Sequence, residues 1–185
     1  GLRGLEALAD NPDADSLLHE LIEVHRQLGR ELGVDDRHWL ARATTLLHEC
    51  LDALRGDAGP ASRAALLAAG EWLSTQIGSR FLVQQGLDVT WVDAREALEV
   101  LPEEELSSAR RWLSASCAAG ADAALESLWS GLGPVLITQG FIARSPEGRT
   151  ALLGRGDGGQ RRARCASALH PRRGRNFDAA VGQGP

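Results

Sequence analysis

The first half of the sequence has the apolar spacing of helices. Apolar side chains recur every three or four residues through residues 17–28, 39–54 and 61–85, which is the period of an amphipathic helix. Asp15 or Ser16 stands where it can cap the first helix. A break at residues 56–60 separates the second helix from the third, and Gly86 is a natural C-terminal stop for the third. The pattern therefore predicts three helices before residue 87.

The second half changes its period. Residues 87–93 alternate like a strand, and residues 134–138 form a short apolar run typical of a buried strand. Between them, residues 103–129 are expected to form a helix with Pro102 near its first turn. Residues 141–144 and 150–153 flank the turn sequence 145–148, which indicates a β-hairpin. This order of elements predicts an α/β domain with a helical N-terminal half and a mainly parallel sheet.

The last segment differs in composition from the rest. Residues 157–185 are rich in Gly, Arg and Ala without an apolar period, so we expect them to be disordered. Six arginines and one aspartate lie in residues 160–185, whereas the net charge of the whole chain is −5. Clustered arginine can neutralise nucleic-acid phosphates, but this tail has one aromatic residue and the body is acidic. Nucleic-acid binding is therefore a minor alternative.

Some residue types are missing from the chain. It contains no lysine, tyrosine or methionine. The absence of lysine excludes an amine nucleophile or a phosphate-binding lysine within these residues. The three cysteines form no CxxC pair, which argues against a zinc site and fits a reducing cytoplasm. No apolar stretch is long enough for a membrane-spanning helix, so no membrane partner is expected.

Two segments could carry chemistry. Glu71 stands in a helix otherwise built of Ala and Leu, although acids are also common on solvated helix faces. The run 139–156 places a strand before glycine-rich loops, with Arg155 between Gly154 and Gly156. Glycines let backbone N–H groups approach an anion, and an arginine supplies a bidentate fork for a carboxylate or phosphate. A pair of glycine-rich turns with a solvated arginine is the plain structural alternative.

These segments together resemble the aspartate kinase family. The resemblance rests on the order GEWLSTQI, GLDVTWVDAREAL and PVLITQGFIARSPEGRTALLGRG, of which the third motif is the specific one. It covers residues 60–156, with residues 1–59 as a helical insertion before the glutamate helix. The wording of the third motif is most similar to the version fused to a diaminopimelate decarboxylase. The resemblance implies a partial amino-acid-kinase-type three-layer αβα domain over residues 1–156.

The family's reaction supplies the functional expectation. The resemblance implies that the parent enzyme transfers the γ-phosphoryl group of ATP, with Mg²⁺, to the side-chain carboxylate of L-aspartate, the first step of lysine, threonine and methionine biosynthesis. Glu71 would contact the amino-acid substrate, Phe141 would line the aspartate pocket, and Arg155 would clamp a substrate carboxylate. The parent is expected to be a homo-oligomer.

The chain also departs from the family. The family's K-F-G-G-T-S strand-loop is absent, and Asp157-Gly158-Gly159 stands where the family continues Gly-Ser-Asp. We therefore expect an inactive fragment with no catalytic residue of its own and no bound cofactor. Dropping one base at the codons of Gln160-Arg161 would restore a frame that can encode Ser-Asp, so we expect a frameshift from about residue 157. A non-catalytic homologue that retains a carboxylate-binding site is the alternative.

Overall fold

The computed structural model describes residue 8, residues 11–34, 37–101 and 107–117, residue 127 and residues 129–154. All structural statements below concern these residues. The predicted disorder of residues 157–185 and the position of Arg155 lie outside them. The division of the chain into residues 1–156 and a tail also remains a prediction.

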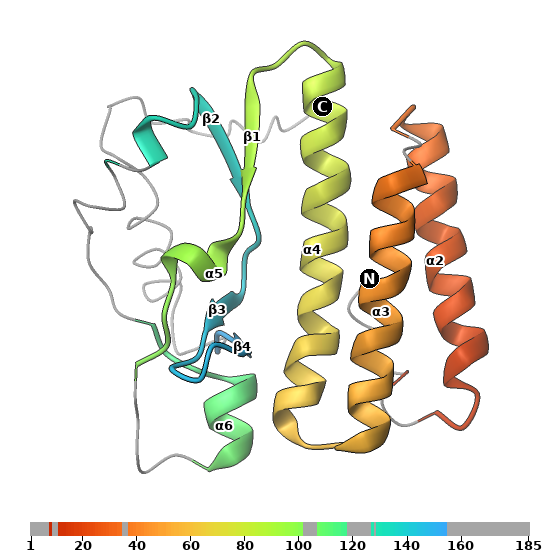
Figure 1. Ribbon diagram of the computed structural model, residues 1–185, viewed down its shortest axis with the longest axis vertical. Coiled ribbons are helices and arrows are strands. Elements are labelled where there is room, and N and C mark those ends of the chain that lie inside the picture. Colours follow the sequence, from red (N-terminus) through yellow and green to blue (C-terminus); the bar gives the residue numbers. More distant parts are fainter. Residues whose placement is uncertain are drawn as a thin grey trace, which may run out of the picture.

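Three long helices form the first half, as the apolar spacing predicts. They are α2 (Ala14–Glu31), α3 (Arg37–Gly56) and α4 (Pro60–Gln84), and they lie side by side in that order (Figure 1). Burial of a leucine or isoleucine side chain stabilises a fold by about 1.5–3 kcal/mol. The apolar faces of these helices close one core, whose fully buried members include Leu18, Leu47, Leu51, Leu66 and Leu73.

The helix ends show where local signals succeed and fail. The N-cap of α2 is Asp13, whose side chain makes no capping hydrogen bond, so the predicted cap at Asp15 or Ser16 is wrong. The backbone N–H of Asp13 instead bonds Asn11 Oδ1 at 2.9 Å. At the end of α4, Gly86 has φ +83°, and the N–H groups of Gly86 and Leu87 bond the carbonyls of Val83 and Leu82. This is a Schellman motif, which confirms Gly86 as the helix stop.

The predicted strands pair as expected. β1 (Val89–Val92) and β2 (Val135–Thr138) run parallel, with Val89 opposite Val135 and Val92 opposite Thr138. β3 (Ile142–Arg144) and β4 (Thr150–Leu152) form the antiparallel hairpin. The turn between them closes through Ser145, whose N–H bonds Arg149 O at 2.7 Å. The α/β fold with a helical N-terminal half and a parallel strand pair is therefore confirmed.

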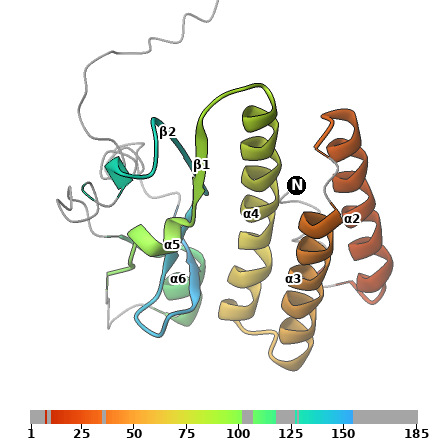
Figure 2. The ribbon, with the colours of Figure 1, turned by 45° about the horizontal axis from the view of Figure 1, so that its top comes forward.

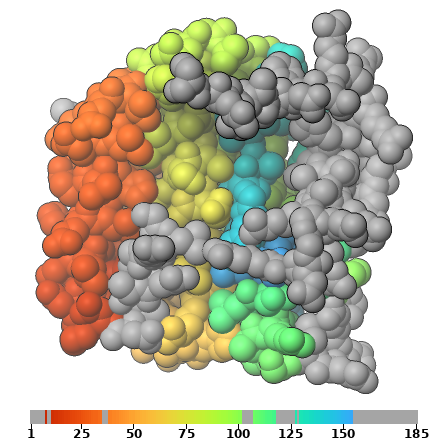
Figure 3. All heavy atoms as spheres, turned by 180° about the vertical axis from the view of Figure 1, so that it is seen from behind, coloured from red at the N-terminus to blue at the C-terminus, as the bar shows by residue number. Residues whose placement is uncertain are grey.

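The α4 helix lies between the other long helices and the strands. It contacts α3 on one side and β1, β4 and α6 (Ser108–Leu113) on the other, an arrangement that Figures 1 and 2 show from two directions. Small side chains on α4 let the hairpin approach closely, and a second core forms there from Ala64, Ala68, Ala94, Trp112, Ile142, Ala151 and Leu152. From behind, atoms of the strands lie directly beside those of α4 (Figure 3).

The helix predicted over residues 103–129 is right for residues 108–113, which form α6, and wrong for residues 114–117, which are not helical. A short helix α5 (Ala94–Ala97) follows β1, and α6 ends at Leu113. The chain then joins the hairpin as extended backbone, because Ala115 N–H bonds Leu152 O at 2.8 Å and Gly154 N–H bonds Ala115 O at 3.0 Å. Pairing with the hairpin thus outweighs the helical propensity of this Ala- and Ser-rich stretch. None of the described helices is long and apolar enough to cross a bilayer.

Candidate acceptor-binding site

The candidate site is built where β1 and β2 end. Ligands of open α/β sheets bind beyond the carboxyl ends of parallel strands. Asp93 follows β1 directly and is the N-cap of α5, where its Oδ1 accepts a hydrogen bond from Arg95 N at 3.0 Å. An aspartate is a favoured N-cap because its short carboxylate satisfies a free N–H of the first turn. The carboxylate is thereby held at the strand end.

Arg95 links this strand end to the hairpin. Its Nε and Nη2 groups donate to the two oxygens of Asp93 at 3.0 and 2.6 Å, a bidentate geometry, and its Nη1 donates to Thr150 Oγ1 at 2.9 Å. Burial works to raise the pKa of the Asp93 carboxyl, but the hydrogen bonds and the charge of Arg95 outweigh it and hold this pKa below its usual range. The same pairing raises the pKa of Arg95. Both groups are therefore charged at neutral pH.

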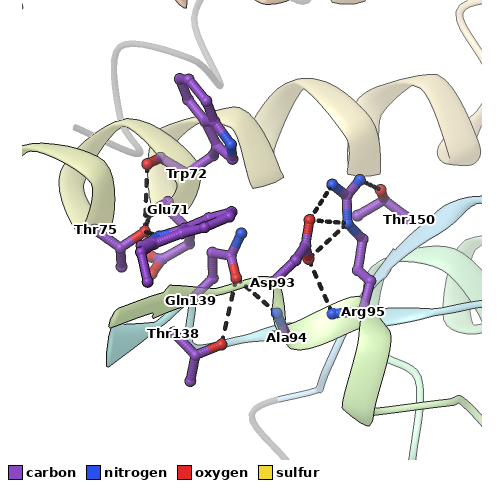
Figure 4. A network of polar contacts seen from close by, with 10 residues as sticks. Glu71, Trp72, Thr75, Asp93, Ala94, Arg95, Thr138, Gln139 and Thr150 are labelled. Carbon is purple, nitrogen blue, oxygen red and sulfur yellow. Dashed lines mark hydrogen bonds and ion pairs between the residues drawn. The ribbon is translucent and has the colours of Figure 1, made fainter. Parts of the chain in front are cut away.

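Gln139 joins the end of β2 to the same helix. Its side chain is 1% exposed, and its Oε1 accepts from Ala94 N at 2.8 Å and from Thr138 Oγ1 at 3.4 Å (Figure 4). The backbone N–H can only donate, so the amide oxygen must face it. Gln139 Nε2 has no hydrogen-bond partner among the described residues. The Gln139 side chain also helps to lower the pKa of Asp93.

Phe141 has an unusual backbone. Its φ is +70°, the left-handed region that residues with a side chain rarely adopt. Its carbonyl accepts a hydrogen bond from Leu153 N at 2.8 Å, and its half-buried ring packs against the second core. Strained backbone of this kind persists only where the surrounding structure holds it, and it often marks functional sites.

Glu71 comes from α4 and is half-buried. Its carbonyl accepts a hydrogen bond from Thr75 Oγ1 at 2.8 Å, and Thr75 in turn accepts one from Trp91 Nε1 at 3.0 Å. Trp72 and Trp91 meet edge to face with ring centroids 6.5 Å apart. These contacts fix the Glu71 turn of α4 against β1 (Figure 4).

A cavity of about 450 Å³ lies between the helices and the hairpin. Neither Glu71 nor Phe141 lines it, so the structure does not bring the expected substrate residues together in this cavity. The polar wall consists of residues that we did not single out from the sequence, although Asp93-Ala94-Arg95-Glu96 and Gln139 lie inside the motifs that carry the resemblance. Its lining includes Arg42, Glu49, Trp72, Arg95, Gln139 and Thr150.

The described residues contain no group of three His, Cys, Asp or Glu side chains placed to hold a metal ion. The chain has no lysine to meet a phosphate. The polar groups of the site, an Asp–Arg pair and a buried amide, are suited to fixing loops around a small polar ligand.

Known proteins resemble this chain in sequence and in fold. No family model matches the sequence. The chain is 32% identical over 114 residues to lysine-sensitive aspartokinase 3 of Escherichia coli (strain K12), a match that spans 62% of this chain and 24% of that protein. Crystal structures of E. coli aspartokinase III, in complex with aspartate and ADP and in complex with lysine and aspartate, match with a TM-score of 0.74 and 25% identity. Each match covers 91% of this chain and 38% of the solved chain.

The fold is thus that of part of an α/β domain of the amino-acid-kinase type. Within that class, the chain is similar in sequence and in structure to part of an aspartokinase, which confirms the resemblance carried by the motifs. The chain spans about a quarter of the curated relative's length.

Proposed function

We propose that this chain carries the amino-acid-acceptor half of an aspartate kinase. In the intact enzyme, the γ-phosphoryl group of MgATP would pass to the side-chain carboxylate of L-aspartate, in the cytoplasm, as the first step of a biosynthetic route. The observation that carries the proposal is the segment from Gln139 to Gly154. It contains the specific motif, and its backbone turns through the left-handed Phe141 at the carboxyl end of β2.

The proposed acceptor contacts follow from charge. Aspartate carries an ammonium group and two carboxylates. Glu71, an acid on α4, complements the ammonium group, and Arg155 offers a planar fork for a carboxylate. The Phe141 ring would close the apolar side of the pocket. Phosphoryl transfer depends mainly on positioning and charge neutralisation, so a half-site that only orients the acceptor would bind substrate without turning it over.

The chain by itself is proposed to be inactive. The family's K-F-G-G-T-S strand-loop is absent from the sequence, and the chain has no lysine. A kinase assay that follows ADP formation from MgATP with and without L-aspartate should therefore show no aspartate-dependent ADP. Aspartate-dependent turnover would contradict this part of the proposal.

Acceptor binding is tested by isothermal titration of the chain with L-aspartate and with succinate, which lacks the ammonium group. Glu71→Gln should weaken aspartate binding and leave succinate binding unchanged, whereas Arg155→Gln should weaken both. Glu20→Gln, which neutralises an exposed acid on α2, is the matched control and should change neither. Absence of aspartate binding to the folded wild-type chain would overturn the proposal.

A further inference from the structure

Phe141 is the one residue other than glycine with a positive φ among the residues that the structure describes. Its left-handed backbone is not a local preference, because a side chain at this φ meets the following carbonyl. The conformation must therefore be imposed by contacts on either side of it.

On its N-terminal side, Phe141 is preceded by an anchored residue. Gln139 is buried, and its Oε1 accepts the Ala94 N–H at the start of α5 at 2.8 Å. Only Gly140 separates this anchor from Phe141. The chain must therefore turn sharply, within three residues, between the end of β2 and the start of β3.

On its C-terminal side, the hairpin is also tied to α5. Arg95 Nη1 donates to Thr150 Oγ1 at 2.9 Å, and Arg144 N–H bonds Leu98 O at 2.8 Å. The Phe141 carbonyl itself accepts from Leu153, the residue after β4. The α5 segment thus holds both arms that flank Phe141, and Asp93 fixes the guanidinium that reaches the hairpin.

We propose that Gln139 and Arg95 are positioning residues that hold Phe141 in its left-handed conformation and so shape the amino-acid pocket. The effect on ligand affinity rests on the proposed function, since it requires that Phe141 contacts the acceptor. The effect on the backbone conformation of Phe141 does not rest on the proposed function.

The test uses the full chain labelled with ¹³C,¹⁵N-phenylalanine. The chain has three phenylalanines, and the Phe141 signal is the one lost in Phe141→Leu. Gln139→Leu removes the acceptor for Ala94 N–H. Thr150→Val removes the acceptor for Arg95, whereas Thr150→Ser keeps a hydroxyl. Thr90→Val is the matched control, because it removes a hydroxyl that bonds Leu132 O at the opposite end of the same strand pair.

Gln139→Leu and Thr150→Val should shift or broaden the Phe141 Cα signal, while Thr150→Ser and Thr90→Val should leave it in place. Titration with L-aspartate should show roughly tenfold weaker binding for the first two variants, since small misplacements of a positioning group weaken a site strongly. An unchanged Phe141 signal in Thr150→Val overturns the proposal, and this variant decides it even if Gln139→Leu fails to fold.

The two possible failures are distinguishable. If the Phe141 signal moves but the wild-type chain binds no aspartate, the positioning role stands and the proposed function fails. If the wild-type chain binds aspartate and the Phe141 signal moves without a change in affinity, the claim that these residues shape the pocket is overturned.

Discussion

Arg95 and Thr150 are 55 residues apart in the sequence, and Arg95 Nη1 donates a 2.9 Å hydrogen bond to Thr150 Oγ1. This hydrogen bond links α5, the helix after β1, to strand β4. The guanidinium is already oriented by its bidentate pairing with Asp93, so it reaches Thr150 at little further entropic cost. The contact joins the parallel strand pair to the hairpin that leads to Gly154.

The Asp93–Arg95 pair predicts a stability change in acid. The pKa of Asp93 is lower in the folded chain than its ordinary value. Its contribution is therefore present above the unfolded pKa of about 3.9 and is lost as the pH falls toward the folded pKa. Urea unfolding between about pH 6 and pH 3 should show a smaller acid-induced loss for Asp93→Asn than for the wild-type chain. If the unfolding free energy depended on pH equally in the two proteins, that result would contradict the charged pair.

The buried thiol of Cys50 predicts a loss of stability at alkaline pH. Burial, followed by the charge of Glu49, raises its pKa to about 11. A group with a raised folded pKa contributes stability below its unfolded pKa and loses it as the pH rises toward 11. Stability should therefore fall more steeply above about pH 9 in the wild-type chain than in Cys50→Ala. The difference between unfolding free energies measured at about pH 8 and pH 10 checks this.

The helical core predicts a large cost for truncation. Leu47 is 0% exposed at the centre of the α3 face, so Leu47→Ala should lower the unfolding free energy by about 2–5 kcal/mol. Val24, on α2, is 63% exposed, and Val24→Ala should change it by less than about 0.5 kcal/mol. Urea denaturation of both variants measures the contrast. A similar loss at the two positions would argue against the helix packing described.

Two glycines of the α4 region should respond in opposite directions. Gly86 has φ +83°, so Gly86→Ala should destabilise the chain by about 1–2 kcal/mol through the left-handed backbone. Gly78 lies inside α4, and an added Cβ there would meet no atom within 4 Å. Gly78→Ala should therefore stabilise by about 0.5–1 kcal/mol. Thermal unfolding of the two variants measures both changes in stability. A loss of stability in Gly78→Ala would contradict the open space around position 78.

Local patterns were sufficient for much of the fold. The apolar period of residues 17–28, 39–54 and 61–85 predicted α2, α3 and α4, and the turn sequence at 145–148 predicted the hairpin. Gly86 marked a helix end because the left-handed C-terminal position is a property of a few neighbouring residues. The motifs also carried the relationship to aspartate kinases, since a run such as Gln139 to Gly154 keeps its chemistry in its order of residues.

Contacts between distant segments decided the rest. The helix expected to continue past Leu113 stops there because Ala115 pairs with Leu152, a partner that no local pattern can reveal. Arg95 donates a hydrogen bond to Thr150, and Ala94 N–H donates one to Gln139. Both bonds depend on β1 and β2 ending at the same edge of the sheet. The left-handed Phe141 follows from those anchors rather than from its own preference. Spacing along the chain encodes short-range order, whereas these bonds exist only after the parallel pair has formed.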